Sequence, residues 1–239
     1  MKTPLAGGCY VLDPFDPEAN VLTPLIDGGS GAKHLSQYAL CLNGKTTPVL
    51  SFGDSDVVVF AVSGAAAAVV SGRAFEVPEH AGLFIRPGEA FQLEPNGDFK
   101  ALVTVCPEAV VNEPDSISDA FDDDFPRRVV EIDPAKKEAM GDRFYQVLVS
   151  TGVGSKNVTQ FIGEIPVSKA PAHHHLYEEA IYVLDGEGFM WTEDQKAPVK
   201  PGSVIFLPRK QEHALECTSS SGLKVVGHFY PTGSPAENY

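Results

Sequence analysis

Four side chains between positions 173 and 213 could together hold one metal ion. They are His173, His175, Glu179 and His213. Three neutral imidazoles and one carboxylate suit the borderline divalent ions of the first transition row, namely Mn, Fe, Co, Ni, Cu and Zn. Four protein ligands on a six-coordinate ion leave two positions open for water or substrate, so the predicted site can support chemistry.

Strands must bring these side chains together. The segment 180–184 is rich in β-branched and aromatic residues and runs into an Asp-Gly pair, which is typical of a strand that ends in a turn. Because side chains of a strand alternate between its faces, His173 and His175 should point the same way and His174 the other way. Glu179, at the head of the next strand, can reach the same point from the side.

The fourth ligand comes from a third segment. His213 follows a short apolar run, 204–207, which Pro208 ends because proline cannot donate to a strand ladder. This places one more imidazole shortly after the end of a predicted strand.

Two motifs in this region resemble the signature of the cupin superfamily. They read His173-x-His175-x3-Glu179-x6-Gly186 and Gly202-x5-Pro208-x4-His213. One position departs, because Lys210 stands where the second motif usually has glycine. The resemblance implies a small antiparallel β-barrel with one divalent metal ion inside its mouth. The alternative is an exposed polar loop, or an inert barrel that kept its shape and lost its ion.

A faded copy of the same pattern lies in the first half of the chain. Residues 56–64 parallel 178–186, and residues 83–87 parallel 204–208, which indicates an internal duplication. No ligand survives in this copy, whose corresponding positions hold Ser51, Gly53, Val57 and either Phe91 or Gln92. We therefore predict that the first copy is a structural partner of the second.

The repeat predicts an all-β chain of two tandem cupin barrels. We expect an N-terminal degenerate barrel over 1–107, an acidic linker over 108–125 that is a solvated loop, and a C-terminal metal-binding barrel over 126–239. The many glycines and prolines, 22 and 19, fit turn-rich β structure. The expected elements are an irregular arm over 9–26, a helical turn within 133–140, and strands at 35–42, 128–132, 144–149, 158–165, 173–175, 179–184, 188–192, 204–207, 213–217 and 224–230.

Composition narrows the class of partner. The net charge of −14 argues against nucleic acid, because its phosphates would be repelled over most of the surface. No apolar window is long enough to span a membrane, and the N-terminus has no secretory signal, so we expect a cytoplasmic protein. The four cysteines are scattered and form no CxxC pair, which favours free thiols over disulfides.

Strand alternation also suggests wall residues for a substrate pocket. An eight-stranded barrel has room for a small molecule and excludes a polymer. If one face of the last strand points inward, His228 and Tyr230 are the candidate catalytic proton carriers, and Gln160 lies beside them on an earlier strand. Tyr182, as a rim aromatic, and Arg209, as a charge near the mouth, complete the candidate substrate-binding set.

The resemblance does not fix the reaction, because one fold hosts many activities. The duplicated layout with one intact C-terminal site is similar to microbial bicupins grouped near ureidoglycine aminohydrolase, although the ligand set differs. We favour a metal-dependent enzyme that acts on a small carboxylate, ureide or sugar-like metabolite by Lewis-acid chemistry. The alternatives are an iron or copper dioxygenase and a non-catalytic binding module. Paired barrels of this superfamily often associate, which makes a homodimer the simplest assembly.

Overall fold

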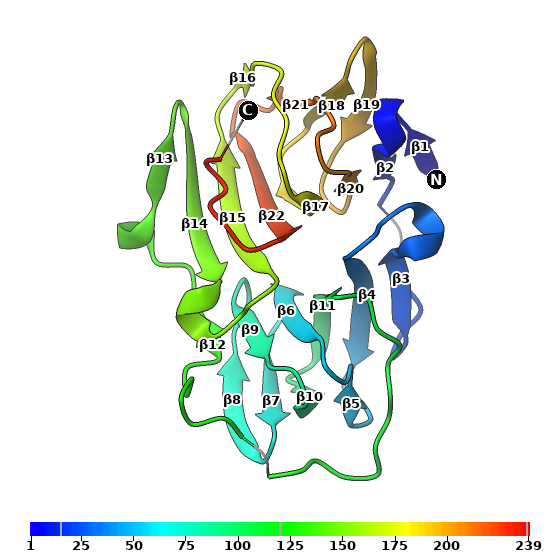
Figure 1. The fold of residues 1–239 in the computed structure, drawn as a ribbon, viewed down its shortest axis with the longest axis vertical. Coiled ribbons are helices and arrows are strands. Elements are labelled where there is room, and N and C mark those ends of the chain that lie inside the picture. Colours follow the sequence, from blue (N-terminus) through cyan, green and yellow to red (C-terminus); the bar gives the residue numbers. More distant parts are fainter. Residues whose placement is uncertain (15, 120, 238) are drawn as a thin grey trace.

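The computed structural model describes residues 1–14, 16–119, 121–237 and 239. Two β-barrels lie end to end, with the C-terminal barrel above the N-terminal barrel in Figure 1. Each barrel is a sandwich of one larger and one smaller antiparallel sheet. The expectation of two tandem cupin-type barrels in an all-β chain is confirmed. None of the helical segments among the described residues is long and apolar enough to cross a lipid bilayer.

The C-terminal barrel carries the metal-ligand motifs. Its larger sheet has the order β1 (Lys2–Pro4), β2 (Tyr10–Leu12), β20 (Val204–Leu207), β17 (Glu178–Asp185), β22 (Leu223–Tyr230), β15 (Thr159–Ile165), β14 (Arg143–Val149) and β13 (Glu138–Met140). Its smaller sheet has the order β16 (Ser168–Lys169), β21 (Ala214–Cys217), β18 (Gly188–Thr192) and β19 (Gln195–Val199).

The N-terminal barrel repeats this layout. Its larger sheet has the order β12 (Val129–Val130), β9 (Gly82–Ile85), β6 (Asp56–Ser63), β11 (Asp98–Cys106), β4 (Ser36–Asn43) and β3 (Leu22–Ile26). Its smaller sheet has the order β5 (Leu50–Ser51), β10 (Ala90–Pro95), β7 (Ala66–Val70) and β8 (Arg73–Val77). The run β9-β6-β11-β4 matches the run β20-β17-β22-β15, so the duplication seen in the sequence is also a duplication of topology.

Four short 3-10 turns complete the described elements: η1 (Ala6–Gly8), η2 (Gly28–Ser30), η3 (Pro134–Lys136) and η4 (Thr151–Val153). The helical turn expected within 133–140 is only η3, because Asp133 caps its N-terminus by accepting a hydrogen bond from the Ala135 amide and the chain then turns into β13. The expected irregular arm over 9–26 instead contains β2 and β3, and β1 precedes it.

The two barrels exchange edge strands. Strand β2, which precedes the N-terminal barrel in sequence, pairs with β20 of the C-terminal barrel, with Val11 opposite Ile205. Strand β12, which precedes the C-terminal barrel, pairs with β9 of the N-terminal barrel. Both segments therefore cross the domain boundaries that we predicted at 1–107 and 126–239.

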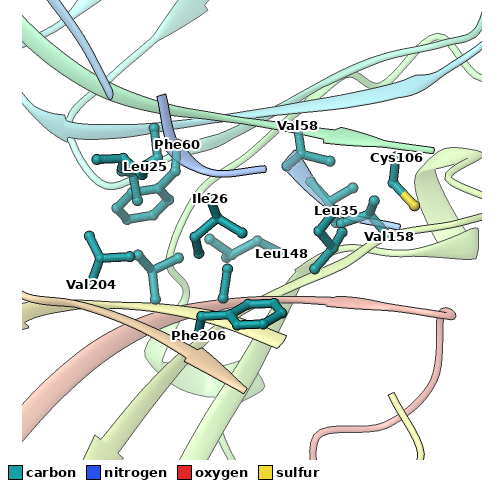
Figure 2. Close-up of a cluster of buried hydrophobic side chains, with 14 of the residues drawn as sticks. Leu25, Ile26, Leu35, Val58, Phe60, Cys106, Leu148, Val158, Val204 and Phe206 are labelled. Atoms are coloured by element: carbon teal, nitrogen blue, oxygen red, sulfur yellow. The ribbon is translucent and has the colours of Figure 1, made fainter. Parts of the chain in front are cut away.

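A shared apolar core joins the barrels. Figure 2 shows side chains of both halves meeting there, among them Val58 and Phe60 from β6 and Phe206 from β20. These three residues are fully buried. Each large sheet therefore has two buried faces, one inside its own barrel and one against the other barrel.

Two buried carboxylates tie the barrels together in a reciprocal manner. Glu178, at the start of β17, accepts hydrogen bonds from the backbone amides of residues 33–35 at 2.9–3.0 Å. Asp56, at the equivalent start of β6, accepts from the backbone amides of Lys156 and Asn157 at 2.9 and 2.7 Å. The loop before β4 and the loop before its counterpart β15 are thus each fastened to the other barrel by charge-assisted hydrogen bonds.

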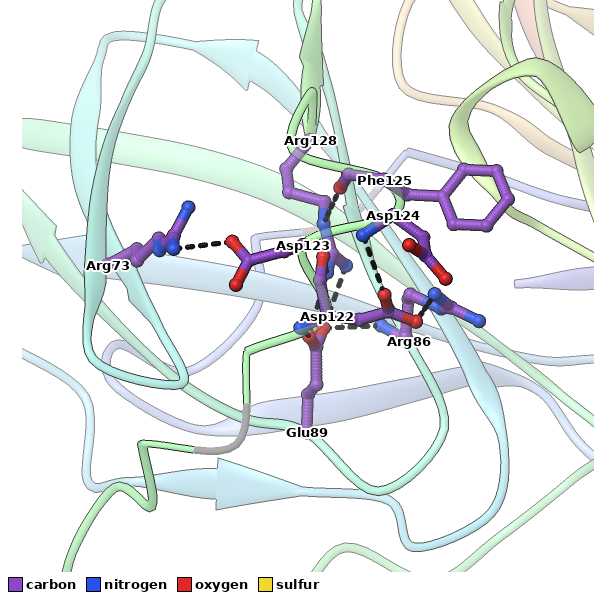
Figure 3. Close-up of polar contacts among 8 residues, drawn as sticks. All are labelled: Arg73, Arg86, Glu89, Asp122, Asp123, Asp124, Phe125 and Arg128. Atoms are coloured by element: carbon purple, nitrogen blue, oxygen red, sulfur yellow. Dashed lines mark hydrogen bonds and ion pairs between the residues drawn. The ribbon is translucent and has the colours of Figure 1, made fainter.

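The acidic linker is docked on the N-terminal barrel, which corrects the expectation of a solvated loop. Asp122 forms an ion pair with Arg86, and Asp123 forms one with Arg73 (Figure 3). Beneath them, the fully buried Arg128 makes a bidentate pair with Glu89, with both N···O distances at 2.8 Å. Arginine side chains of the N-terminal barrel form ion pairs with the acidic residues of the linker, so these acidic residues attach the linker to the barrel.

The interior of the N-terminal barrel is filled by apolar side chains. Phe91, at a position that corresponds to His213, is fully buried, and so are its neighbours Leu83 and Phe99. Val57, at the position that corresponds to Glu179, belongs to the same cluster. Hydrocarbon therefore occupies the region where the other barrel carries its polar site.

Candidate metal centre

Three of the predicted ligands converge in the C-terminal barrel. His173, His175 and His213 each offer a ring nitrogen, and these nitrogens all lie within 4.8 Å of one another. His173 and His213 form an isolated backbone bridge, with N···O distances of 3.0 and 2.8 Å, so the expected strand over 173–175 is reduced to this bridge. The bridge brings together two motifs that are 40 positions apart in sequence, and only the folded barrel does so.

Backbone carbonyls fix the orientation of all three rings. The Nδ1 atoms of His173, His175 and His213 lie 2.9, 3.1 and 2.8 Å from the carbonyl oxygens of Pro171, Glu237 and Gln211. A carbonyl oxygen can only accept a hydrogen bond, so each Nδ1 carries the proton. The Nε2 atom of each ring is therefore a free lone-pair donor, which is the form in which histidine binds a metal.

Burial keeps these imidazoles neutral. Desolvation lowers the pKa of His175 to about 4 and that of His213 to about 3, although the hydrogen bond from each ring to the backbone acts in the opposite direction. The pKa of His173 is lowered for the same reason. At neutral pH protons therefore do not compete with a metal ion for the three nitrogens.

Glu179 lies in the same cavity but outside the group of three nitrogens. Its Oε2 atom is 3.8 Å from Nε2 of His175, and the side chain is 3% exposed. Burial raises the pKa of this carboxyl to about 8. A carboxylate that is so poorly solvated gains greatly from a nearby cation, so the position suits the predicted fourth ligand.

Two motif positions that are not metal ligands, Gly186 and Lys210, shape the turns around the site. Gly186 has φ +82, and a Cβ atom there would lie 2.1 Å from the carbonyl oxygen of Gly222, so only glycine fits. Lys210, where the second motif usually has glycine, itself adopts φ +65. Its amide donates to the carbonyl oxygen of His175 at 2.7 Å, so the turn keeps the glycine-type backbone and remains bonded to the ligand loop.

A small and largely apolar cavity of about 80 Å³ opens on the site. Tyr177 stacks on the ring of His175 at 4.4 Å and on Phe229 at 4.0 Å, which makes a rigid aromatic wall behind the metal ligands. The other cavity residues are Met140, Arg143, Phe144, Tyr145, Phe161, Gly163, Ile165, Ile181, Met190, Leu215, Val225 and Pro235.

Arg143 and Tyr177 are among the wall residues that the sequence analysis did not predict. Arg143, at the start of β14, is 9% exposed and donates from Nη2 to the carbonyl oxygen of Leu215 at 2.9 Å. Tyr177 lies in the loop before β17 and is 6% exposed. The proximity of Tyr177 to the ligand motif could have drawn attention to it, whereas no local pattern singles out Arg143.

His228 and Gln160 lie on the opposite face of their strands from the metal ligands. His228 is fully buried between the barrels, where the side-chain amides of Gln37 and Gln160 contact its two ring nitrogens at 3.3 and 2.8 Å. The inward residues of these strands are instead Phe161 and Phe229, one position away from each prediction. The sequence-based choice of face is therefore corrected, and neither His228 nor Gln160 reaches the cavity.

The other three predicted residues also lie away from the cavity walls. Tyr182 packs against the core between the barrels, on the face of β17 opposite Glu179. Tyr230 contacts the ring of His34, with ring centroids 4.5 Å apart. The guanidinium of Arg209 lies 5.4 Å over the Tyr230 ring. The structure thus brings together the predicted metal ligands but not the predicted substrate-binding and proton-carrying residues.

Comparisons with known proteins agree with this architecture. Residues 163–229 match the family model of the cupin domain. An uncharacterized protein of Methanocaldococcus jannaschii is 38% identical over 80 residues, which are 32% of this chain and 64% of that protein. The chain thus spans less than two thirds of the length of this curated relative.

Two solved structures resemble the whole chain. The protein Ylba from E. coli superposes with a TM-score of 0.74 at 15% identity, over 98% of this chain and 95% of that one. An oxalate decarboxylase superposes with a TM-score of 0.70 at 12% identity, over all of this chain and 76% of that one. At such identities the likeness shows the fold alone. The chain is therefore a cupin-fold protein of two tandem barrels, and the match to the cupin domain falls on the barrel that holds the three histidines.

Proposed function

We propose that the chain is a metal-dependent enzyme with one site, in the C-terminal barrel, that acts on a small polar metabolite. The observation that carries this proposal is the arrangement of His173, His175 and His213. Three neutral rings converge, those of His175 and His213 are buried, and a backbone carbonyl holds each ring in the tautomer that leaves Nε2 free. A metal ion would use all three Nε2 lone pairs at once.

The donor set fits a divalent ion of the first transition row. The three histidines would hold the ion, and Glu179 would complete the set and supply negative charge. A bound ion would act as a Lewis acid toward an oxygen of the substrate. Neutral imidazoles with a carboxylate accept Mn, Fe, Co, Ni, Cu or Zn, so the donor set does not select among these metals.

The rest of the cavity would bind the substrate and exclude water. Phe161 lines the cavity, Phe229 packs behind Phe161 and Tyr177, and the volume of about 80 Å³ admits only a small molecule. Burial and the nearby carboxyl groups of Glu179 and Glu237 raise the pKa of Tyr177, so its hydroxyl stays protonated at neutral pH. In this proposal Tyr177 donates a hydrogen bond to the substrate.

Metal analysis of a matched pair of variants tests the proposal. The protein purified without added metal should contain about one transition-metal ion per chain by elemental analysis. His175→Ala should lose this ion, because it removes a buried ligand. His174→Ala should keep it, because His174 packs on Tyr239 and its backbone bonds to that residue. Circular dichroism should show that both variants remain folded.

The identity of the metal separates the reaction classes. Mn, Zn or Ni supports Lewis-acid chemistry on a carboxylate, ureide or sugar-like compound, whereas Fe or Cu with oxygen uptake would point to a dioxygenase. Stoichiometric metal in His175→Ala would contradict the ligand assignment. Wild-type protein that contains no metal and does not bind added Co²⁺ would contradict the proposal as a whole. A homodimer is the assembly that accompanies this proposal, and light scattering after gel filtration measures it.

A further inference from the structure

Arg143 is a buried cation beside the candidate metal centre. It lines the cavity together with His173 and His213, and its positive charge is close enough to act on the His173 ring. Only 9% of the residue is exposed. The hydrogen bond from Nη2 to the carbonyl oxygen of Leu215 anchors the guanidinium on β21, across the barrel from its own strand β14.

Protein groups compensate this charge only in part. Asp142 is the acid in ion-pair contact with Arg143 among the described residues, and its oxygen lies 3.6 Å from Nε while 60% of its side chain is exposed. An exposed carboxylate at that distance is strongly screened by water. The described residues provide no hydrogen-bond partner for Nη1. Part of the guanidinium therefore remains available to an anion in the cavity.

While a metal is bound, no other polar group of the cavity can supply a negative charge to pair with Arg143. The three histidines are neutral, the carboxyl of Glu179 would be committed to the ion, and the hydroxyl of Tyr145 donates to Glu138 at 2.8 Å. A bound uncharged substrate would displace water from the guanidinium and leave the cation without a partner, which is costly in an apolar pocket. A carboxylate matches the planar fork of arginine in both charge and shape.

We propose that the site takes a small substrate with a carboxylate group, which Arg143 binds while another oxygen of the substrate faces the metal. This inference rests on the proposed function and selects the carboxylate from among the three substrate classes considered there. Arg143 thereby determines specificity, because its position sets where the negative end of the substrate lies.

Binding of two isosteric probes tests the inference. The protein is loaded with Co²⁺, and glycolate and glycolamide are titrated while the visible absorption of the ion is followed. Both molecules can approach the metal through the same hydroxyl group, but only glycolate carries a charge. A charge-assisted hydrogen bond changes affinity by about tenfold to a hundredfold. We expect Arg143→Gln to reduce the ratio of the two affinities by at least tenfold. Arg127→Gln, which changes an exposed arginine just after the linker, should leave the ratio unchanged.

A second pair of variants keeps the test decisive if Arg143→Gln does not fold. Asp142→Asn removes the exposed competitor and should strengthen glycolate binding about twofold to threefold, and Arg143→Lys should keep a preference for the charged probe. An affinity ratio that is unchanged in Arg143→Gln, or equal affinities for the two probes in Arg143→Lys, would overturn the role of Arg143 while the metal site stands. Failure of the wild-type protein to bind Co²⁺ would overturn both proposals.

Discussion

His228 should make the protein sensitive to acid. Burial lowers the pKa of this imidazole to about 3 from an ordinary value of 6.5, and the side chain is fully buried between the barrels. The folded protein therefore keeps the ring neutral, while the unfolded chain binds a proton below pH 6.5. Stability from this residue is complete above pH 6.5 and is lost as the pH falls from 6.5 toward 3.

The size of the effect follows from these two pKa values. At pH 5.0 the unfolded ring is mostly protonated and the folded ring is not. The resulting loss is about 1.36 kcal/mol for each of about 1.5 pH units, or about 2 kcal/mol. At pH 7.5 the same term is close to zero. Replacing His228 by Gln, which can also donate to and accept from the amides of Gln37 and Gln160, should remove the term.

Urea unfolding at pH 7.5 and pH 5.0 measures this term. Protein freed of metal by chelation is used throughout, so that the other histidines titrate alike in every variant. Wild type should lose about 2 kcal/mol more than His228→Gln between the two pH values. His174→Gln, which changes a partly exposed histidine, should behave as wild type does. Equal losses in wild type and His228→Gln, within about 0.5 kcal/mol, would refute the assignment of a buried neutral imidazole.

Four further predictions concern the joints of the fold and the site. Glu178→Gln should lower the free energy of unfolding by about 1–3 kcal/mol in urea, because it weakens three backbone hydrogen bonds. Glu179→Gln should make the metal-free protein more stable than wild type at neutral pH, because burial raises the pKa of the Glu179 carboxyl while the unfolded chain ionises it freely, and it should weaken Co²⁺ binding at least tenfold in a calorimetric titration. Glu89→Gln should cost about 3–5 kcal/mol because it leaves Arg128 as an unpaired buried cation, and a normal melting temperature would contradict this. Deletion of residues 1–12 should expose the edge of β20 and cause concentration-dependent aggregation, which light scattering detects.

The metal ligands could be read from the sequence because their information is local. The spacing of His173 and His175 on one extended segment, with Glu179 shortly after, needs no knowledge of the partner strands. The internal repeat likewise predicted both barrels, since it compares the chain only with itself. The loss of ligands in the first copy was also visible, and the structure shows what replaces them, with Phe91 and its neighbours filling the interior.

The substrate wall could not be read in the same way. Alternation reveals the inward face of a strand only when the other face meets water. Strands β15 and β22 are buried on both faces, because one face of each strand points toward the cavity and the opposite face packs against the N-terminal barrel. Phe229 and His228 are then equally plausible from the pattern. Arg143 was missed for a related reason, since its contact with β21 joins two sheets that no sequence spacing relates.

The exchange of edge strands bears on how the chain is made. During synthesis β2 leaves the ribosome long before β20, the strand with which it pairs. The N-terminal barrel likewise waits for β12, which follows the linker. The N-terminal barrel cannot close until β12 has emerged, and the C-terminal barrel cannot close until β20 has emerged, so the pairing of β2 with β20 forms late. The barrel that carries the metal ligands is thus completed by the first residues of the chain.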